Sequence, residues 1–102
     1  MAFPIDRFRD EIQRCCSQLK VARLDLFGSG TTDEFSNESD LDFLVSFLPG
    51  QADLLGKFLA LKEQLERTLK RRVDLVSSKS VKNPFFQETI ERTRKNVFAA
   101  QS

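Results

Sequence analysis

The spacing of apolar residues along this 102-residue chain switches repeatedly between a helical and a strand period. The first run recurs at three- and four-residue steps and comprises Ile5, Phe8, Ile12, Cys15 and Leu19. It predicts one amphipathic helix that begins near Pro4. The segment 21–27 alternates instead and predicts a strand that ends at Gly28. One face of that strand is expected to carry Val21, Arg23, Asp25 and Phe27, because residues two apart share a face.

The rest of the chain repeats this change of period. Strand patterns cover 40–47 and 71–78, and a leucine stripe predicts a helix of about four turns over 54–69. A further helix is expected over 84–93, whereas 96–100 fits either a short terminal strand or a frayed end. The order helix, strand, loop, strand, helix, strand, helix predicts an α/β or α+β architecture with helices on one face of a small sheet.

Length and charge limit the classes of protein that this chain can represent. A chain of 102 residues suffices for a single domain, which we expect to span 1–102. Sixteen Lys and Arg residues against fifteen Asp and Glu give a formal net charge of +1, so we expect no specific nucleic-acid partner. No stretch approaches the ~20 apolar residues of a membrane-spanning helix. We therefore expect a soluble, cytoplasmic protein without membrane association.

The side chains available for catalysis are limited as well. The chain has no histidine, which excludes histidine acid–base catalysis and zinc binding through histidine. The two cysteines, Cys15 and Cys16, are adjacent within the first predicted helix, where neighbours are poorly placed for an ordinary disulfide. We expect both to be reduced thiols.

Carboxylates gather on two of the predicted strands. Asp40 and Asp42 are two residues apart, so their side chains share a face. Two carboxylates at ~4 Å repel by about 4 kcal/mol at an effective dielectric of about 20, a cost that a bound cation would offset. Asp74 interrupts an apolar strand and would complete a cluster of three if that strand lies beside 40–47. Oxygen ligands without His or Cys favour Mg²⁺ or Mn²⁺.

A turn of Gly28, Ser29 and Gly30 follows the first predicted strand directly. Backbone N–H groups and a small hydroxyl at such a turn can hold phosphate oxygens. It is not a Walker loop, because no Gly-Lys-Ser/Thr follows. A phosphate-binding turn opposite metal-binding carboxylates suits phosphoryl or nucleotidyl transfer. One metal ion then lowers the pKa of the attacking hydroxyl, and a second neutralises the pyrophosphate that leaves.

Each of these features also has a purely structural explanation. A Gly-Ser pair after a strand is common in hairpin turns and loops, and an Asp-x-Asp pair at a strand start is common at solvated edges and loop caps. Asp74 would equally be explained by a surface ion pair with Arg71 or Arg72.

Together, however, the motifs match a known pattern. LFGSGTTDEFSNESDLDFLVSF (26–47) resembles the signature of DNA polymerase β-like nucleotidyltransferases, and more narrowly of the minimal nucleotidyltransferases of bacteria and archaea. That signature is an apolar or aromatic residue, Gly-Ser, a spacer, then Ser-Asp-x-Asp and an apolar strand. RRVDLVSS (71–78) is similar to the strand that carries the family's third carboxylate, and KNPFFQETIERTRKNVFAA (82–100) is similar to its C-terminal segment. The resemblance covers about 21–100.

The resemblance implies an α+β fold, a small mixed sheet with helices packed on one face. It implies that Gly28 and Ser29 bind the triphosphate and that Asp40, Asp42 and Asp74 bind the metal ions. Asp74 would also help to deprotonate the acceptor hydroxyl. The implied reaction is Mg²⁺-dependent transfer of AMP from ATP to a hydroxyl, with release of pyrophosphate. Two Mg²⁺ ions are expected, with Mn²⁺ as an alternative.

The chain departs from the family pattern directly after Gly-Ser. Many relatives carry arginines there, whereas this chain has Thr31, Thr32 and Asp33. Cationic contacts to phosphate are therefore missing from this turn. The chain also has no tyrosine, so it cannot be its own tyrosine-modified substrate.

The resemblance also implies partners. Minimal members commonly pair with a small helical HEPN-type protein as antitoxin and toxin, and some place AMP on a tyrosine of the toxin. We therefore expect a nucleoside triphosphate and a HEPN-type protein as partners, in a homodimer or a hetero-oligomer. Two other hypotheses remain. One is a module of the same fold that neutralises its partner by binding alone, with weak or lost catalysis. The other is a nucleic-acid binder built on Lys70, Arg71 and Arg72 and the basic tail, which the lack of interleaved aromatic residues disfavours.

Overall fold

The computed structural model describes residues 2–100, so Met1, Gln101 and Ser102, the ends of the expected domain 1–102, lie outside the described residues. The helices are α1 (Arg9–Gln18), α2 (Leu54–Leu69) and α3 (Pro84–Thr93), and the strands are β1 (Val21–Phe27), β2 (Leu41–Phe47), β3 (Val73–Ser77) and β4 (Lys95–Ala99). Short 3₁₀ turns cover Ile5–Phe8, Gly28–Thr31 and Ser78–Ser80. Every helix and strand expected from the sequence is present, and the segment 96–100, which the sequence left open, lies mostly in β4.

The four strands form one mixed sheet in the order β3–β2–β1–β4. β1 is antiparallel to both β2 and β4, whereas β2 is parallel to β3. A parallel pair needs a long crossover connection, and α2 provides it between β2 and β3. The expected α+β class with a small mixed sheet is confirmed.

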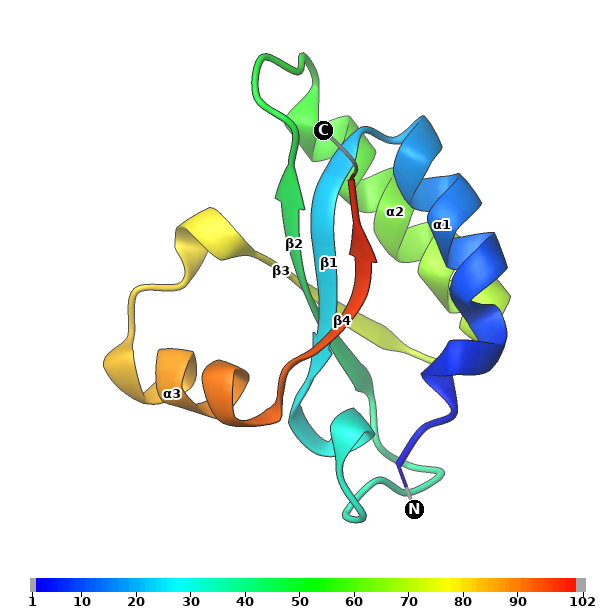
Figure 1. Cartoon of the computed structure of the whole chain (residues 1–102), viewed down its shortest axis with the longest axis vertical. Helices are drawn as coiled ribbons and strands as arrows, with labels where there is room; N and C mark the ends of the chain where they lie inside the picture. Colours follow the sequence, from blue (N-terminus) through cyan, green and yellow to red (C-terminus); the bar gives the residue numbers. More distant parts are fainter. Residues whose placement is uncertain (1, 101–102) are drawn as a thin grey trace.

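The main core lies between the sheet and the helices α1 and α2, which run side by side along one face (Figure 1). It contains Ile12 and Cys16 of α1, Leu61, Leu65 and Leu69 of α2, and the strand residues Leu24, Leu26, Leu41, Phe43, Val45, Val73 and Val97. Because alternate residues of β2 point into this core, the side chain of Asp42, between Leu41 and Phe43, must point to the opposite face.

α3 lies on the other side of the sheet (Figure 1). There Ile90 of α3 packs against Phe27 of β1 and Leu44 of β2. The expected placement of helices on one face is therefore correct for α1 and α2 but not for α3. The physical reason is that β1 and β2 carry apolar side chains on both faces at this end of the sheet, and the second face also needs cover from water.

β1 departs from strict alternation at its start. Val21 is buried in the main core with the helices α1 and α2, not on the face of Arg23 and Asp25 where alternation predicted it. The pairing of β1 with β2 shifts register between Val21 and Arg23. Such an irregularity adds a residue to one strand, so the residues before it change face.

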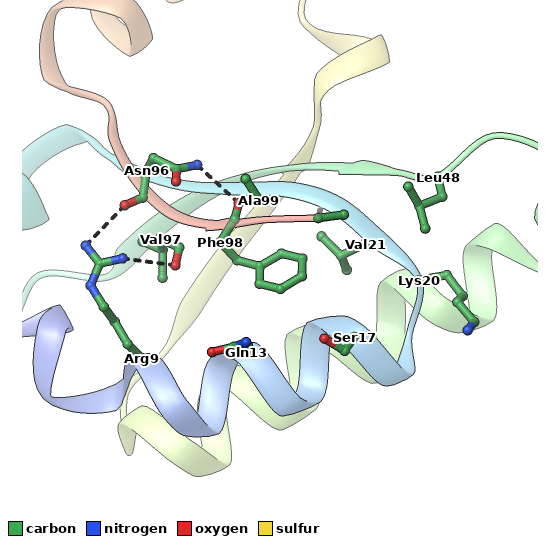
Figure 2. A pocket seen from close by; sticks show the side chains of 11 residues that line it. Arg9, Gln13, Ser17, Lys20, Val21, Leu48, Asn96, Val97, Phe98 and Ala99 are labelled. Carbon is green, nitrogen blue, oxygen red and sulfur yellow. Dashed lines mark hydrogen bonds between the residues drawn. The ribbon is translucent and has the colours of Figure 1, made fainter. Parts of the chain in front are cut away.

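The outer edge of the sheet, at β4, is covered by a side chain of α1 (Figure 2). Arg9 donates from Nη1 to the carbonyl oxygen of Val97 at 3.2 Å and from Nη2 to that of Asn96 at 3.3 Å. Unpaired carbonyl groups on an edge strand would otherwise be open to pairing with another strand. Within residues 2–100, no helix is long and apolar enough to cross a membrane.

A buried charge joins α3 to the sheet. Asp25 of β1 is fully buried. It accepts hydrogen bonds from Arg94 Nε at 2.9 Å and Nη2 at 2.5 Å, from Asn96 Nδ2 at 2.9 Å and from Arg23 Nε at 3.2 Å. Burial raises the pKa of Asp25, but the hydrogen bonds from Asn96, Arg94 and Arg23 outweigh burial and hold the pKa below its usual value. Arg94 directly follows α3, so this cluster fixes the end of that helix over β1 and β4.

We predict that replacing Arg94 with Met lowers the free energy of unfolding by roughly 2–4 kcal/mol, because a buried carboxylate loses its main cationic partner. Arg67→Met is the matched control. Arg67 pairs with Glu63 on the surface of α2, where 69% and 61% of the two side chains are exposed, and its loss should cost at most about 0.5 kcal/mol. Urea denaturation followed by circular dichroism measures both, and equal losses would contradict the prediction.

The same cluster predicts a pH dependence. The pKa of Asp25 is lower in the folded chain than in the unfolded one. Its charged form therefore stabilises the fold above about pH 4, and this contribution disappears as the pH falls further. The stability difference between the wild type and Asp25→Asn should stay constant down to about pH 4 and shrink as the pH falls further, through the lowered pKa of Asp25. A difference that stays constant or grows as the pH falls below about 4 would contradict this assignment.

Candidate active site

The turn after β1 has a left-handed backbone that glycine favours. Gly28 has φ +76°, and it opens the 3₁₀ turn Gly28–Thr31. A Cβ atom built on Gly28 would lie 2.7 Å from Oδ2 of Asp42. Glycine is thus required here both by the backbone angle and by the close approach of a carboxylate. This contact brings the Gly-Ser turn and the Asp-x-Asp strand together, as the sequence predicted.

α3 holds this turn from the other side. The amide of Gly28 donates to Oγ1 of Thr93 at 2.8 Å, and the Thr93 hydroxyl donates to the carbonyl oxygen of Thr89 at 2.7 Å. The Gly28 amide is thus already engaged, which leaves Ser29 as the residue of the Gly-Ser pair with a free donor. Within residues 2–100 the Ser29 hydroxyl makes no hydrogen bond, and the residue is half-exposed.

The two threonines in place of the family's arginines close the turn on itself. Thr31 Oγ1 donates to the carbonyl oxygen of Gly28 at 3.0 Å, and Thr32 Oγ1 donates to that of Ser29 at 3.1 Å. These bonds keep the two hydroxyls within the turn. They stabilise its shape but supply no positive charge for a phosphate group.

The aspartates of β2 and β3 lie next to each other in the sheet. In the parallel pairing, Asp42 is the register partner of Asp74. Asp40 precedes β2 by one residue and is exposed, Asp42 is half-buried, and Asp74 is exposed. The sheet therefore brings Asp42 beside Asp74 and beside the Gly28 turn, with Asp40 at the entrance to the same strand.

The environment of Asp42 is unfavourable for a negative charge. Burial, together with the nearby negative charges of Asp74 and Asp40, raises the pKa of Asp42 to about 6. None of the three aspartates is hydrogen-bonded or ion-paired through its side chain to another residue within 2–100. The alternative that Asp74 is a surface partner of Arg71 or Arg72 is therefore wrong.

These carboxylates fit a hard divalent cation. Their donors are all oxygen, and burial together with the charges of Asp74 and Asp40 raises the pKa of Asp42, so a bound cation would favour its charged form. Mg²⁺ and Mn²⁺ are the ions that such a donor set suits. As the side chains stand, no three acidic or thiol groups within 2–100 converge closely enough to hold a metal ion.

A separate hollow contains none of the predicted site residues. It has a volume of about 600 Å³ and lies between α1 and β4 (Figure 2). Arg9, Ser17, Lys20 and Asn96 are among its lining residues. No carboxylate lines it, and Arg9 is already bonded to the backbone of β4. We therefore assign the candidate site to the aspartates and not to this hollow.

Two residues that support the site could not be identified from the sequence. Thr93 is 65 residues from Gly28 along the chain, and a threonine near a helix end is unremarkable. The sequence places Arg71 at the start of a strand or in a surface ion pair with Asp74. In the structure, its side chain instead binds the loop that precedes Asp40. Only the packing of α3 and the pairing of β2 with β3 reveal these contacts.

Comparisons with known proteins identify the family and the fold. The family model described as "Polymerase beta, Nucleotidyltransferase" matches residues 10–102. A Methanocaldococcus jannaschii protein named "Putative protein adenylyltransferase MJ1379" is 39% identical over 72 residues, which are 71% of this chain and 72% of that protein.

Solved structures share the fold. A structure of a "putative minimal nucleotidyltransferase" superposes with a TM-score of 0.73 at 32% identity and covers 89% of this chain and 90% of its own. A complex of a tri-AMPylated HEPN toxin with an MNT antitoxin, from Shewanella oneidensis, matches with a TM-score of 0.63 at 18% identity, covering 94% of this chain and 73% of that chain. At 18% identity, the second match shows only that the two proteins share a fold.

We predict that Gly28→Ala weakens Mn²⁺ binding roughly tenfold or more, as displacing a supporting group around a metal site does. The new Cβ would occupy the space of the Asp42 carboxylate. Gly50→Ala is the matched control, because Gly50 has φ +77° and nothing within 4 Å of a new Cβ. Both variants should lose about 1–2 kcal/mol of stability through the left-handed backbone. Calorimetric titration with Mn²⁺ measures the affinities, and equal affinities in the two variants would contradict the assigned geometry.

Proposed function

The chain belongs to the polymerase β nucleotidyltransferase family, and from this premise we propose that it transfers AMP from ATP to a hydroxyl of a partner protein. The observation that carries the proposal is the juxtaposition of the Gly28 turn with Asp42, and of Asp42 with Asp74 across the parallel pair β2–β3. The naming of a relative as a protein adenylyltransferase supports AMP as the group transferred and a protein as the acceptor.

In this proposal the turn after β1 binds the triphosphate. The Ser29 hydroxyl donates to a phosphate oxygen, and Gly28 contributes by keeping the turn clear of the Asp42 carboxylate. Thr93 fixes the turn by accepting the hydrogen bond of the Gly28 amide. The acceptor oxygen attacks the α-phosphorus of ATP, the bond from that phosphorus to the β-phosphate oxygen breaks, and pyrophosphate leaves.

Asp40, Asp42 and Asp74 would hold Mg²⁺, two ions in our expectation, with Mn²⁺ as an alternative. When bound, the metal supplies stabilisation of the negative charge that develops on the phosphate oxygens. Asp74 is exposed and lies at the start of an edge strand, so an acceptor hydroxyl from another protein can reach its carboxylate. That carboxylate accepts the proton of the hydroxyl as the new bond to phosphorus forms.

The proposal places the acceptor on a second protein. The chain has no tyrosine of its own to modify. A fold neighbour pairs an MNT antitoxin with an AMPylated HEPN toxin, and we extend that relationship to this chain as a cytoplasmic antitoxin with a HEPN-type partner. In this assembly the single domain 1–102 supplies the nucleotide and metal site, and the partner supplies the hydroxyl.

A second candidate function is neutralisation of the partner by binding alone. One observation favours it: the turn carries Thr31 and Thr32 where many relatives carry arginines, and their hydroxyls close the turn instead of binding phosphate. Such a protein would keep the fold and the interface but transfer little or no AMP. The two functions differ in whether Asp42 is needed.

We predict that Asp42→Asn reduces AMP transfer by roughly 100-fold or more, the range seen when an enzyme loses one electrostatic contact to its transition state. Asp10→Asn is the matched control, because Asp10 is an exposed aspartate on α1, away from the site. Each purified protein is incubated with Mg²⁺, host lysate and ATP that is radiolabelled on its α-phosphate, and the label on protein is followed over time.

Label transferred by the wild type and Asp10→Asn, but not by Asp42→Asn, supports the enzyme. If Asp42→Asn labels protein as fast as the wild type, the site assignment is wrong. If no variant labels protein, yet Asp42→Asn still silences the partner in cells, the binding module is the better description.

A further inference from the structure

The guanidinium of Arg71 binds the loop that leads from the Gly28–Thr31 turn to Asp40. Arg71 precedes β3 by two residues and Asp74 by three. Its Nη1 donates to the carbonyl oxygens of Asn37 at 3.2 Å and Ser39 at 3.3 Å, and its Nη2 donates to Oδ1 of Asn37 at 3.3 Å. One side chain thus binds the loop between β1 and β2 through three acceptors.

Two aromatic rings hold the same guanidinium from other directions. Its central carbon lies 4.6 Å from the ring centroid of Phe35, in the loop, and 5.8 Å from that of Phe3, in the N-terminal segment. The rings of Phe3 and Phe35 meet edge to face at 5.5 Å. The amide of Phe3 donates to the carbonyl oxygen of Gly30 at 2.9 Å. The cluster therefore extends to the Gly28–Thr31 turn.

These contacts fix the backbone on both sides of Asp40. On one side, Arg71 Nη1 binds the carbonyl of Ser39. On the other, the amide of Leu41 donates to the carbonyl oxygen of Arg72 at 3.0 Å. Asp40 lies between these two bonds, and within residues 2–100 its side chain makes no hydrogen bond or ion pair. Its position relative to Asp74 is thus set by the residues that lead into β3.

We propose that Arg71 is a positioning residue for the nucleotidyl transfer, which locks the loop 31–39 so that Asp40 is held beside Asp42 and Asp74. The inference rests on the proposed function for its catalytic consequence, though not for the loop order itself. The basic residues before β3 then have distinct roles. Arg71 orders the loop through its side chain, whereas the exposed Arg72 bonds to Leu41 through its backbone carbonyl and, within residues 2–100, makes no side-chain hydrogen bond or ion pair.

The contacts need an arginine and not merely a positive charge. Three hydrogen bonds to two residues together with ring stacking match a planar group with five donors. A lysine ammonium at the same position keeps the charge but cannot stack as a plane or reach all three acceptors at once. Arg71→Lys therefore removes the contacts that position Asp40 and leaves the net charge unchanged.

The test compares Arg71→Lys with Arg72→Lys, the same substitution one residue along. Three quantities are measured in the full chain: kcat and KM for ATP in AMP transfer, Mn²⁺ affinity by calorimetric titration, and amide hydrogen exchange in the segment 31–40. We expect Arg71→Lys to lower kcat by roughly 10- to 100-fold, the size of effect that misplacement by about 1 Å produces. KM for ATP should change less than about threefold, because the turn at Ser29 is untouched.

We also expect faster exchange in 31–40 for Arg71→Lys and weaker Mn²⁺ binding, with a melting temperature close to that of Arg72→Lys. Arg72→Lys should match the wild type in every readout. Equal kcat, exchange and Mn²⁺ affinity in the two variants would overturn the proposal. So would a fall in kcat that merely follows a general loss of stability, with faster exchange across the whole chain.

A second variant keeps the test informative if Arg71→Lys does not fold. Asn37→Ala removes an exposed side-chain acceptor of Arg71 and leaves the core intact, and it should shift exchange and Mn²⁺ affinity in the same direction by a smaller amount. If the wild type itself transfers no AMP, the proposed function fails. Exchange and Mn²⁺ binding still decide whether Arg71 orders the loop and holds Asp40.

Discussion

The parallel pairing of β2 with β3 is the constraint on which the rest of the site depends. It makes Asp42 and Asp74 register partners although they are far apart in sequence. The pairing is itself held by the main core, in which Leu41, Phe43 and Val45 of β2 face the helices α1 and α2. Burial of these apolar residues fixes which way the strand faces, since a shift of one residue would turn every side chain over. The stability of the core therefore determines the direction in which Asp42 points.

The opposite face of the sheet carries α3, which fixes the turn beside Asp42. α3 packs there through Ile90, and Asp25 fixes the end of α3 through Arg94. The same helix supplies Thr93 to the Gly28 amide. The two aspartates on this face, Asp25 and Asp42, therefore have different surroundings. Asp25 is fully satisfied by donors and stabilises the fold, whereas Asp42 is half-buried beside like charges. A carboxylate left in that state is suited to bind a cation.

Periodicity predicted the helices and strands because apolar residues recur at the period of each element. The motifs predicted that Gly28, Ser29, Asp40, Asp42 and Asp74 are neighbours because the family pattern contains them. The predictions that were wrong concern features that depend on the packing of the elements against one another. The irregularity after Val21 moved that residue into the core, and the apolar face made by Phe27 and Leu44 drew α3 to the opposite side of the sheet. Thr93 and Arg71 act across 65 and more than 30 residues of sequence, respectively, so no local pattern marks them.

The most direct test of the account is a melting curve followed by circular dichroism, with ATP alone, Mg²⁺ alone and both together. The chain has neither Trp nor Tyr, so intrinsic fluorescence from those residues cannot report unfolding. Ligand at 100 times its dissociation constant stabilises by about 2.7 kcal/mol, which should raise the melting temperature of a domain of this size by roughly 10 °C or more. The account predicts a rise that needs both ligands and is lost in Asp42→Asn. An equal rise in Asp42→Asn, or no rise in the wild type at millimolar ligand, would contradict it.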